Sequence, residues 1–403
     1  MRQFKVLATA FAAALLVTAC GGGGDGDQSP RVSLKSVKVM GDSLSDSGTF
    51  GALGTGSTYG RIFSVQGTTH QIWTERTATA LGISTPLCNV YQFTGATFVA
   101  NPTPGCTSFA VGGARINNPA SAGGAAAPFS IIKQLRDASA AANHQASDLL
   151  LIDGGGNDAA DLVGAYLKAS TDGGAAFMGL LGSLPGTTLP TAAAGFPAAG
   201  ASYMTTLANS FYDTIKTSAL DKGAVHVAIV NVPGITNTPR FQMVLDSIAK
   251  ATSDGNLAAG ASAAAAASAG ATARAQSEAL FQGWVQAFNT QLSSRAAGNS
   301  AVVVVDLYTN FNEQVAHPEQ FGLTNVKTPA CPMTGVGSDG LPSYNFETCT
   351  GAALSLQTPP TGAMGGANWW KTYAFSDGFH PTPYGYQLMG QLVARSLAQA
   401  GWL

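Results

Sequence analysis

Charged residues are scarce in this sequence, at 10% of its 403 residues, against roughly 25% in an average soluble protein. The 20 basic and 22 acidic side chains leave a formal charge of −2. A nucleic-acid-binding protein would carry a clustered positive excess, so we exclude nucleic acid as a partner. The low charge also argues against a charge-rich disordered chain. Hydrophobic residues reach 45%, which is enough for a large core.

Several motifs that would point to other chemistry are missing or poorly matched. No C-x-x-C pair or neighbouring histidine accompanies the cysteines, so we predict no metal site. The G-x-S-x-G turn, which carries the nucleophile in one large class of α/β enzymes, is absent. A glycine pattern at residues 154–159 formally matches a dinucleotide-binding site, but three aspartates would repel a pyrophosphate there: Asp153, Asp158 and Asp161. We therefore predict no cofactor.

The N-terminus is typical of an export signal. Arg2 and Lys5 precede an apolar stretch over residues 6–19. At about 14 residues this stretch is shorter than the roughly 20 that a membrane-spanning helix needs. Small residues lead up to Cys20, and a glycine-rich segment follows it. No later apolar run is long enough to cross a bilayer.

This pattern resembles the lipobox of bacterial lipoproteins, in which the cysteine is lipidated after cleavage. We therefore predict a signal peptide over residues 1–19, a lipidated Cys20 with a flexible tether over 20–35, and one folded domain over 36–403. The resemblance implies an exported protein whose lipid anchor holds it to a membrane, at the outer membrane or cell surface. The alternative is an ordinary cleavage site with an incidental cysteine, in a periplasmic or secreted protein.

Four further cysteines predict disulfides, because an even number in an exported chain is usually paired. Three connectivities are possible. We favour the two pairs that are local in sequence, since each encloses loop-like sequence rich in proline, glycine and asparagine: Cys88–Cys106 and Cys331–Cys349.

Short and nearly continuous apolar runs predict buried strands of a parallel sheet. They lie at residues 37–40, 108–111, 149–152, 225–232 and 301–305. Patterns with helical spacing lie between them, at residues 70–81, 129–138, 203–220 and 280–292. A last helix is expected after Thr382, a good capping residue that precedes a proline. This alternation indicates one α/β domain.

Two segments resemble insertions into this pattern. Residues 171–201 are rich in glycine, alanine and proline, and residues 254–275 form an alanine tract that leads into a long helix. We interpret both as surface decoration, since long loops are well tolerated. For residues 171–201 the alternative is an apolar lid beside an active site.

Polar residues suited to catalysis follow the first predicted strand and recur near the C-terminus. Ser43 belongs to a G-D-S-L motif in the turn after that strand, at the sheet edge where ligands bind in parallel α/β proteins. Asp377 precedes His380 by three residues, so its carboxylate can fix the imidazole tautomer and leave the other nitrogen facing a substrate. The three side chains supply a nucleophile, its base and an orienting carboxylate.

Four short motifs in order resemble the blocks of the GDSL, or SGNH, family of serine hydrolases. They are G-D-S-L at 41–44, S-F-A-V-G-G-A at 108–114, G-G-N-D at 155–158 and D-G-F-H at 377–380. The second block departs from many members, which have asparagine in place of Ser108. The blocks span nearly all of the predicted domain. The resemblance implies a three-layer α/β/α sandwich around a mostly parallel sheet of about five strands.

The resemblance also implies a role for each matching residue. Ser43 would attack the substrate, with His380 as base and Asp377 as the carboxylate that orients it.

Three groups would bind the oxyanion that forms in this attack: the Ser43 N–H, the Gly112 N–H and the side-chain amide of Asn157. Gly113 replaces Gly112 if the glycine register is shifted by one. Asp158 would hold its loop through backbone hydrogen bonds.

The sequence therefore predicts an exported carboxylic-ester hydrolase of the lipase or esterase branch, with an acyl ester or lipid as substrate. An acyltransferase or a lysophospholipase would use the same acyl-enzyme chemistry and stays an alternative. From another class, a surface lipoprotein that binds lipid or glycan without turnover is the second hypothesis.

Overall fold

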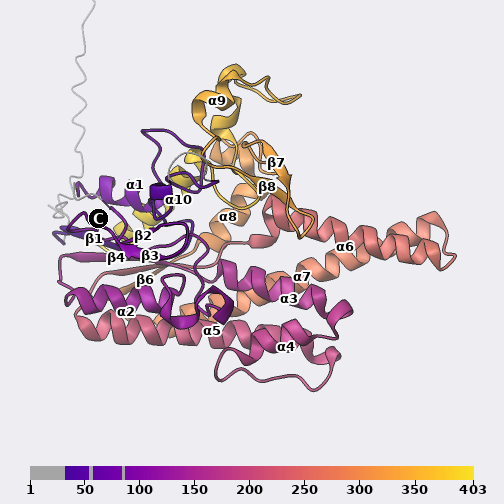
Figure 1. The fold of residues 1–403 in the computed structure, drawn as a ribbon, viewed down its shortest axis with the longest axis horizontal. Coiled ribbons are helices and arrows are strands. Elements are labelled where there is room, and N and C mark those ends of the chain that lie inside the picture. Colours follow the sequence, from indigo (N-terminus) through magenta and orange to yellow (C-terminus); the bar gives the residue numbers. More distant parts are fainter. Residues whose placement is uncertain (1–31, 54–57, 84–86) are drawn as a thin grey trace, which may run out of the picture.

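The computed structural model describes residues 32–53, 58–83 and 87–403. The predicted signal peptide and Cys20 lie outside these ranges, as does most of the tether. Within the described ranges, no helix is both long and apolar enough to span a bilayer. Figure 1 shows a central sheet between helices, with one helical hairpin that extends away from the rest.

A parallel four-stranded sheet forms the centre of the domain. Its order is β1 (Ser36–Met40), β4 (Asp148–Asp153), β5 (Val227–Val230) and β6 (Val302–Val305). Every residue of β4 and β5 is buried. These strands have helices on both faces, which explains why their sequences are continuous apolar runs rather than alternating ones.

An extended segment at residues 107–111 takes the place of the predicted fifth strand. It lies parallel to β1 on the edge away from β4, where the Val39 N–H donates to Thr107 O (3.0 Å) and the Phe109 N–H donates to Val39 O (2.7 Å). It forms only a single bridge to β1, because the chain turns away directly afterwards. The sheet thus has four strands and one strand-like edge segment, instead of five strands.

Helices cover both faces of the sheet and complete the predicted three-layer α/β/α sandwich (Figure 1). Alternate residues of β1 supply two cores: Met40 lies in one, and Val37 and Val39 lie in the other. The first core includes side chains from α2 (Ile131–Ala141), α5 (Phe196–Ser218) and the C-terminal half of α7 (Ala263–Ala296). The second includes side chains from α1 (Trp73–Ala80) and α10 (Pro383–Gln399).

Helix α10 begins where the sequence predicted. The Thr382 side chain accepts a hydrogen bond from the Gly385 N–H (3.1 Å), and Pro383 is the first helical residue. This cap lies two residues after His380 and fixes the start of α10.

The segment 171–201 is largely helical and contributes to the core, which differs from the predicted surface decoration. It contains α4 (Ala175–Gly182) and the first residues of α5. Phe177 is fully buried and stacks on Phe196 with ring centroids 4.7 Å apart. Its large apolar side chains therefore order a segment whose overall composition is typical of a loop.

The alanine tract at 254–275 belongs to the protruding hairpin, which is formed by α6 (Pro239–Ala258) and α7 (Figure 1). The two helices approach closely at Gly270, where an added Cβ would lie 2.5 Å from Ala249 O. Small side chains here thus permit backbone contact between two helices.

The remaining elements are short, apart from α3 (Gly156–Asp172) and α8 (Leu307–Ala316). Two hairpins consist of β2 (Tyr91–Phe93) with β3 (Phe98–Ala100) and of β7 (Met333–Val336) with β8 (Pro342–Tyr344), and α9 spans Gly351–Leu356. The structure contains both predicted disulfides, Cys88–Cys106 and Cys331–Cys349.

Candidate active site

The predicted site residues meet at the carboxyl edge of the sheet. Ser43 follows β1, the glycines at 112–113 follow the segment 107–111, and Asn157 lies at the start of α3 directly after β4. The segment 107–111 and β4 flank β1 on opposite sides, so the chain reverses its direction across the sheet at β1. Open α/β sheets bind ligands in the crevice at such a reversal.

A tight turn presents the Ser43 hydroxyl at this edge. The Leu44 N–H donates to Asp42 Oδ1 (3.0 Å), and the Ser45 N–H donates to Asp42 O (3.1 Å). Ser43 is 8% exposed, and its Oγ lies 2.7 Å from His380 Nε2. The hydroxyl thus contacts an imidazole while it remains accessible from the cavity.

Asp377 orients the imidazole ring of His380. Its Oδ2 lies 2.9 Å from His380 Nδ1, while Oδ1 accepts the N–H groups of Phe379 (2.9 Å) and His380 (2.7 Å). Burial alone would raise the pKa of the Asp377 carboxyl, but His380 and these N–H groups outweigh burial and hold that pKa below its ordinary value. The carboxylate therefore stays charged, keeps a proton on Nδ1 and leaves Nε2 to accept one from Ser43.

The N–H of Gly112 has a partner inside the protein. It donates to Asp46 Oδ2 (2.7 Å), and the other oxygen of that buried carboxylate accepts the N–H groups of Gly48 (2.9 Å) and Thr49 (2.8 Å). This bond differs from the sequence-based role, in which the Gly112 N–H faces an oxyanion. The next residue, Gly113, has φ +79°, and its N–H has no hydrogen-bond partner within the described ranges.

Asn157 lies across the crevice from Ser43, and both residues line one cavity. The Asn157 Nδ2 group donates to Ala114 O (2.9 Å) and, at 3.4 Å, to Asp42 Oδ2. The weak second bond leaves an N–H that a stronger acceptor in the cavity could attract. Asp158 accepts the N–H groups of residues 116 and 117 (2.9 and 2.8 Å), which agrees with the structural role expected for it.

Sequence reasoning missed a pair of buried carboxyl groups beneath the Ser43 turn. Asp153, at the end of β4, accepts a hydrogen bond from the Ser45 hydroxyl, and its carboxyl group interacts with that of Asp42. Burial and the neighbouring Asp42 raise the pKa of Asp153 well above its ordinary range. An acidic residue directly after the apolar run at 149–152 was the available signal.

A cavity of about 500 Å³ opens beside Ser43 and His380. Its wall is mostly apolar, with aromatic side chains that include Phe50, Tyr59, Phe63, Phe93, Phe241 and Phe379. Two aromatic rings contact the imidazole of His380, with centroids at 5.2 Å for Phe63 and 5.5 Å for Phe346. No residue of 171–201, the alternative lid, is among the described residues that line the cavity.

Comparison with known proteins agrees with the order of the motifs. Among solved structures, the chain is similar to the lipase Lip_vut3 from a goat rumen metagenome, with 13% identity, a TM-score of 0.36, and coverage of 91% of this chain and 98% of that one. A search of curated proteins finds no match. The sequence model of the GDSL-like Lipase/Acylhydrolase family matches residues 37–393, a range that includes all four motifs. The chain therefore belongs to the GDSL-like lipase/acylhydrolase family.

Proposed function

We propose that this hydrolase is an exported carboxylic-ester hydrolase of the lipase or esterase type, with Ser43, His380 and Asp377 as its catalytic triad. The observation that carries the proposal is the continuous hydrogen-bonded relay from Ser43 Oγ to His380 Nε2 (2.7 Å) and from His380 Nδ1 to Asp377 Oδ2 (2.9 Å). A buried, charged carboxylate at one end and an accessible hydroxyl at the other are what acyl transfer to a serine needs.

The reaction proceeds in two steps. Ser43 Oγ attacks the ester carbonyl while its proton moves to His380 Nε2, and the resulting imidazolium is stabilised by Asp377. The tetrahedral intermediate collapses, and the alcohol leaves with the proton from Nε2. Water then attacks the acyl-enzyme by the same route, with His380 again as base, and the carboxylic acid is released.

The oxyanion of the intermediate requires donors that are not already engaged. We assign this role to the backbone N–H groups of Ser43 and Gly113, which have no other hydrogen-bond partner within the described ranges, and to Asn157 Nδ2. Gly113 thus takes the part that the sequence suggested for Gly112, whose N–H is held by Asp46. Asn157 would exchange its long bond to Asp42 for a shorter one to the oxyanion.

The cavity wall favours esters with an apolar acyl group over short polar ones. Aromatic rings dominate the space of about 500 Å³ next to Ser43, and burial of each methylene there contributes about 0.8 kcal/mol. A series of p-nitrophenyl esters from acetate to palmitate would measure the preferred chain length. We expect kcat/KM to rise from acetate and then to fall once the acyl chain outgrows the cavity.

Labelling by a fluorophosphonate tests the nucleophile directly. We expect the wild-type protein to be labelled at Ser43 and to hydrolyse a soluble ester, and Ser43→Ala to lose both properties. Ser247→Ala, which changes an exposed hydroxyl on α6, is the matched control and should behave like wild type. A folded wild-type protein that neither reacts with the probe nor turns over esters would instead be a non-catalytic lipid- or glycan-binding protein. Product analysis with an added acceptor alcohol separates acyl transfer from hydrolysis.

We also propose that Cys20 carries lipid and tethers the enzyme to a membrane. The N-terminal pattern supports the proposal, since small residues precede the cysteine and a glycine-rich segment follows it. The two disulfides are compatible with an exported protein, because disulfides persist in oxidising compartments.

A further inference from the structure

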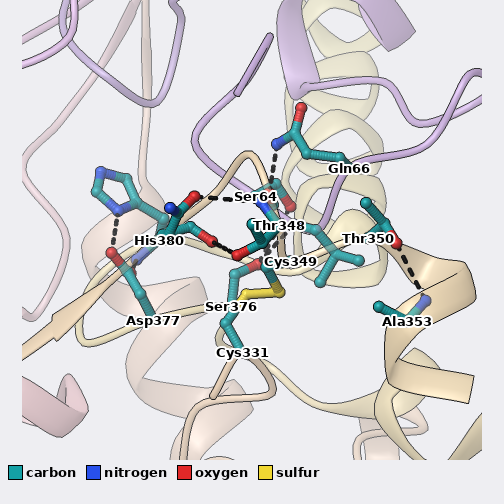
Figure 2. Close-up of a disulfide and its surroundings, with 12 residues drawn as sticks. Ser64, Gln66, Cys331, Thr348, Cys349, Thr350, Ala353, Ser376, Asp377 and His380 are labelled. Atoms are coloured by element: carbon teal, nitrogen blue, oxygen red, sulfur yellow. Dashed lines mark hydrogen bonds and ion pairs between the residues drawn. A yellow bond between two sulfur atoms is a disulfide. The ribbon is translucent and has the colours of Figure 1, made fainter. Parts of the chain in front are cut away.

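The Cys331–Cys349 disulfide lies directly beside the loop that carries Asp377 and His380 (Figure 2). It closes the loop of residues 331–349, which contains the β7–β8 hairpin. Both cysteines are buried, at 4% and 1% exposure. The bond is therefore not an exposed cross-link but part of the packing around the proposed base.

Each half of the disulfide is hydrogen-bonded to a segment of the active site. The Cys331 N–H donates to Ser376 O (2.8 Å), one residue before Asp377. On the other side, the Gln66 N–H donates to Cys349 O (2.8 Å). Through these hydrogen bonds the disulfide connects the segment that leads into the Asp377–His380 loop with the chain segment at residues 64–66.

These two segments also meet each other, as Figure 2 shows. The Val65 N–H donates to Ser376 Oγ (3.3 Å), and the Ser64 hydroxyl donates to Pro381 O (2.8 Å). The Ser376 N–H donates to His380 O (2.7 Å), which closes the catalytic loop itself. These hydrogen bonds form a closed circuit that holds the two ends of the Asp377–His380 loop. The Cys331–Cys349 disulfide is the covalent part of this circuit.

Loop 331–349 also places an aromatic ring, that of Phe346, against His380. Phe346 is 6% exposed, its N–H donates to Thr58 O (3.0 Å), and its ring lies 5.6 Å from Phe63 and 5.5 Å from His380. Since Phe63 also contacts the imidazole, the three rings form one cluster in which each contacts the other two. An imidazole held in this way has little freedom to rotate away from Ser43.

We propose that the disulfide-closed loop 331–349 is a positioning element for His380, and that it acts through the hydrogen-bonded circuit and through Phe346. The proposal rests on the proposed function, since it assumes that His380 is the base. Each hydrogen bond of the circuit can open by itself, but the covalent link keeps Cys331 and Cys349, which hold the two segments through hydrogen bonds, next to each other. Because a displacement of about 1 Å at a reacting group can cost about a hundredfold in rate, loss of this link affects turnover before it affects folding.

The second disulfide provides a matched control. Cys88 and Cys106 are separated by 18 residues, as are Cys331 and Cys349, so the chain-entropy model assigns both bonds the same contribution to stability. The Cys88–Cys106 pair, however, makes no hydrogen bond to Asp377 or His380 within the described ranges: the Cys88 carbonyl accepts the Ser108 N–H.

The experiment compares the double variant Cys331→Ala/Cys349→Ala with Cys88→Ala/Cys106→Ala. Both are assayed on a soluble ester at a temperature where thermal unfolding shows each to be folded. We expect kcat of the first to fall about 10- to 100-fold with KM little changed. The second should keep a kcat close to that of wild type, although it loses comparable thermal stability. Equal kcat values for the two variants would overturn the proposal.

A second pair of variants tests the proposal if Cys331→Ala/Cys349→Ala does not fold. Phe346→Ala leaves the disulfide intact but removes one of the rings beside His380, so we expect a fall of about tenfold in kcat with little change in KM. Phe346→Leu retains much of the volume and should recover part of this loss. An unchanged kcat in Phe346→Ala would count against the proposal. A wild-type protein without esterase activity would refute the proposed function, and this inference with it.

Discussion

Replacement of Asp153 by asparagine tests whether the carboxyl pair beneath Ser43 holds a proton. Asp153 is 3% exposed, and one of its oxygens already accepts the Ser45 hydroxyl. Burial and then Asp42 raise its pKa well above the ordinary value, which favours the protonated carboxyl and allows it to donate to Asp42. Asparagine has the same shape as a protonated aspartate: its oxygen can accept from Ser45 and its amide can donate to Asp42. We therefore expect Asp153→Asn to fold and to retain activity.

The pH dependence of the free energy of unfolding sets the size of the expected difference between wild type and Asp153→Asn. An unfolded aspartate releases its proton near pH 3.9, whereas folded Asp153 keeps it to higher pH. Between these two values unfolding releases a proton, so the free energy of unfolding of wild type falls by about 1.36 kcal/mol for each unit of rising pH. Asp153→Asn lacks this titration. Its stability relative to wild type should therefore increase by about the same amount per pH unit in this window.

Urea unfolding of both proteins at several pH values measures this difference, and infrared difference spectroscopy should show a protonated carboxyl band that Asp153→Asn lacks. Asp153→Ala is the control, because it leaves Asp42 without the donor and creates a void. It should be less stable than Asp153→Asn at every pH. A difference between wild type and Asp153→Asn that does not change with pH would refute the shared proton.

Four further variants test other parts of the molecule. Asn157→Ala should lose about 10²- to 10³-fold in kcat with little change in KM, because the amide acts mainly on the charge that develops in the transition state; steady-state kinetics on a soluble ester measures both. Gly200→Ala should lower the free energy of unfolding by about 1–3 kcal/mol, since its Cβ would lie 2.4 Å from Trp284. Gly164→Ala, on an exposed helical position with open space around it, should instead be neutral or stabilising by about 0.5–1 kcal/mol in the same thermal or urea unfolding assay. Cys20→Ser should move the protein from the membrane fraction to the soluble fraction, and a variant that still partitions with membranes would contradict the lipid anchor.

The parts of the fold that sequence predicts well are those where burial dictates composition. The runs at 149–152 and 301–305 became β4 and β6 because strands covered on both faces need apolar side chains at every position. The segment 171–201 differs because its glycine, alanine and proline content is typical of a loop, while its few large side chains decide the outcome. Phe177 is buried against Phe196, and this tertiary contact overrides the local composition.

In the candidate site, contacts between residues close in sequence could be predicted, whereas contacts between residues far apart in sequence could not. Asp377 and His380 are three residues apart, so their contact is a property of one turn that a short motif can encode. The Gly112 N–H is different, because its partner Asp46 lies 66 residues away in the chain and no spacing rule relates the two. A motif therefore identifies which residues gather at an edge of the sheet, but not which of their polar groups remain available for a substrate.

The disulfide loop extends this argument to residues that lie outside every motif. The pairing of Cys331 with Cys349 could be predicted because their separation in sequence is short, and proximity in the chain favours proximity in space. The contact of Phe346 with His380 could not, because it depends on where the closed loop packs in the folded domain. Since the Cys331 N–H binds the residue that precedes Asp377, the loop and the proposed triad share one hydrogen-bonded circuit. A substitution in loop 331–349 therefore has a direct structural route to the geometry of His380.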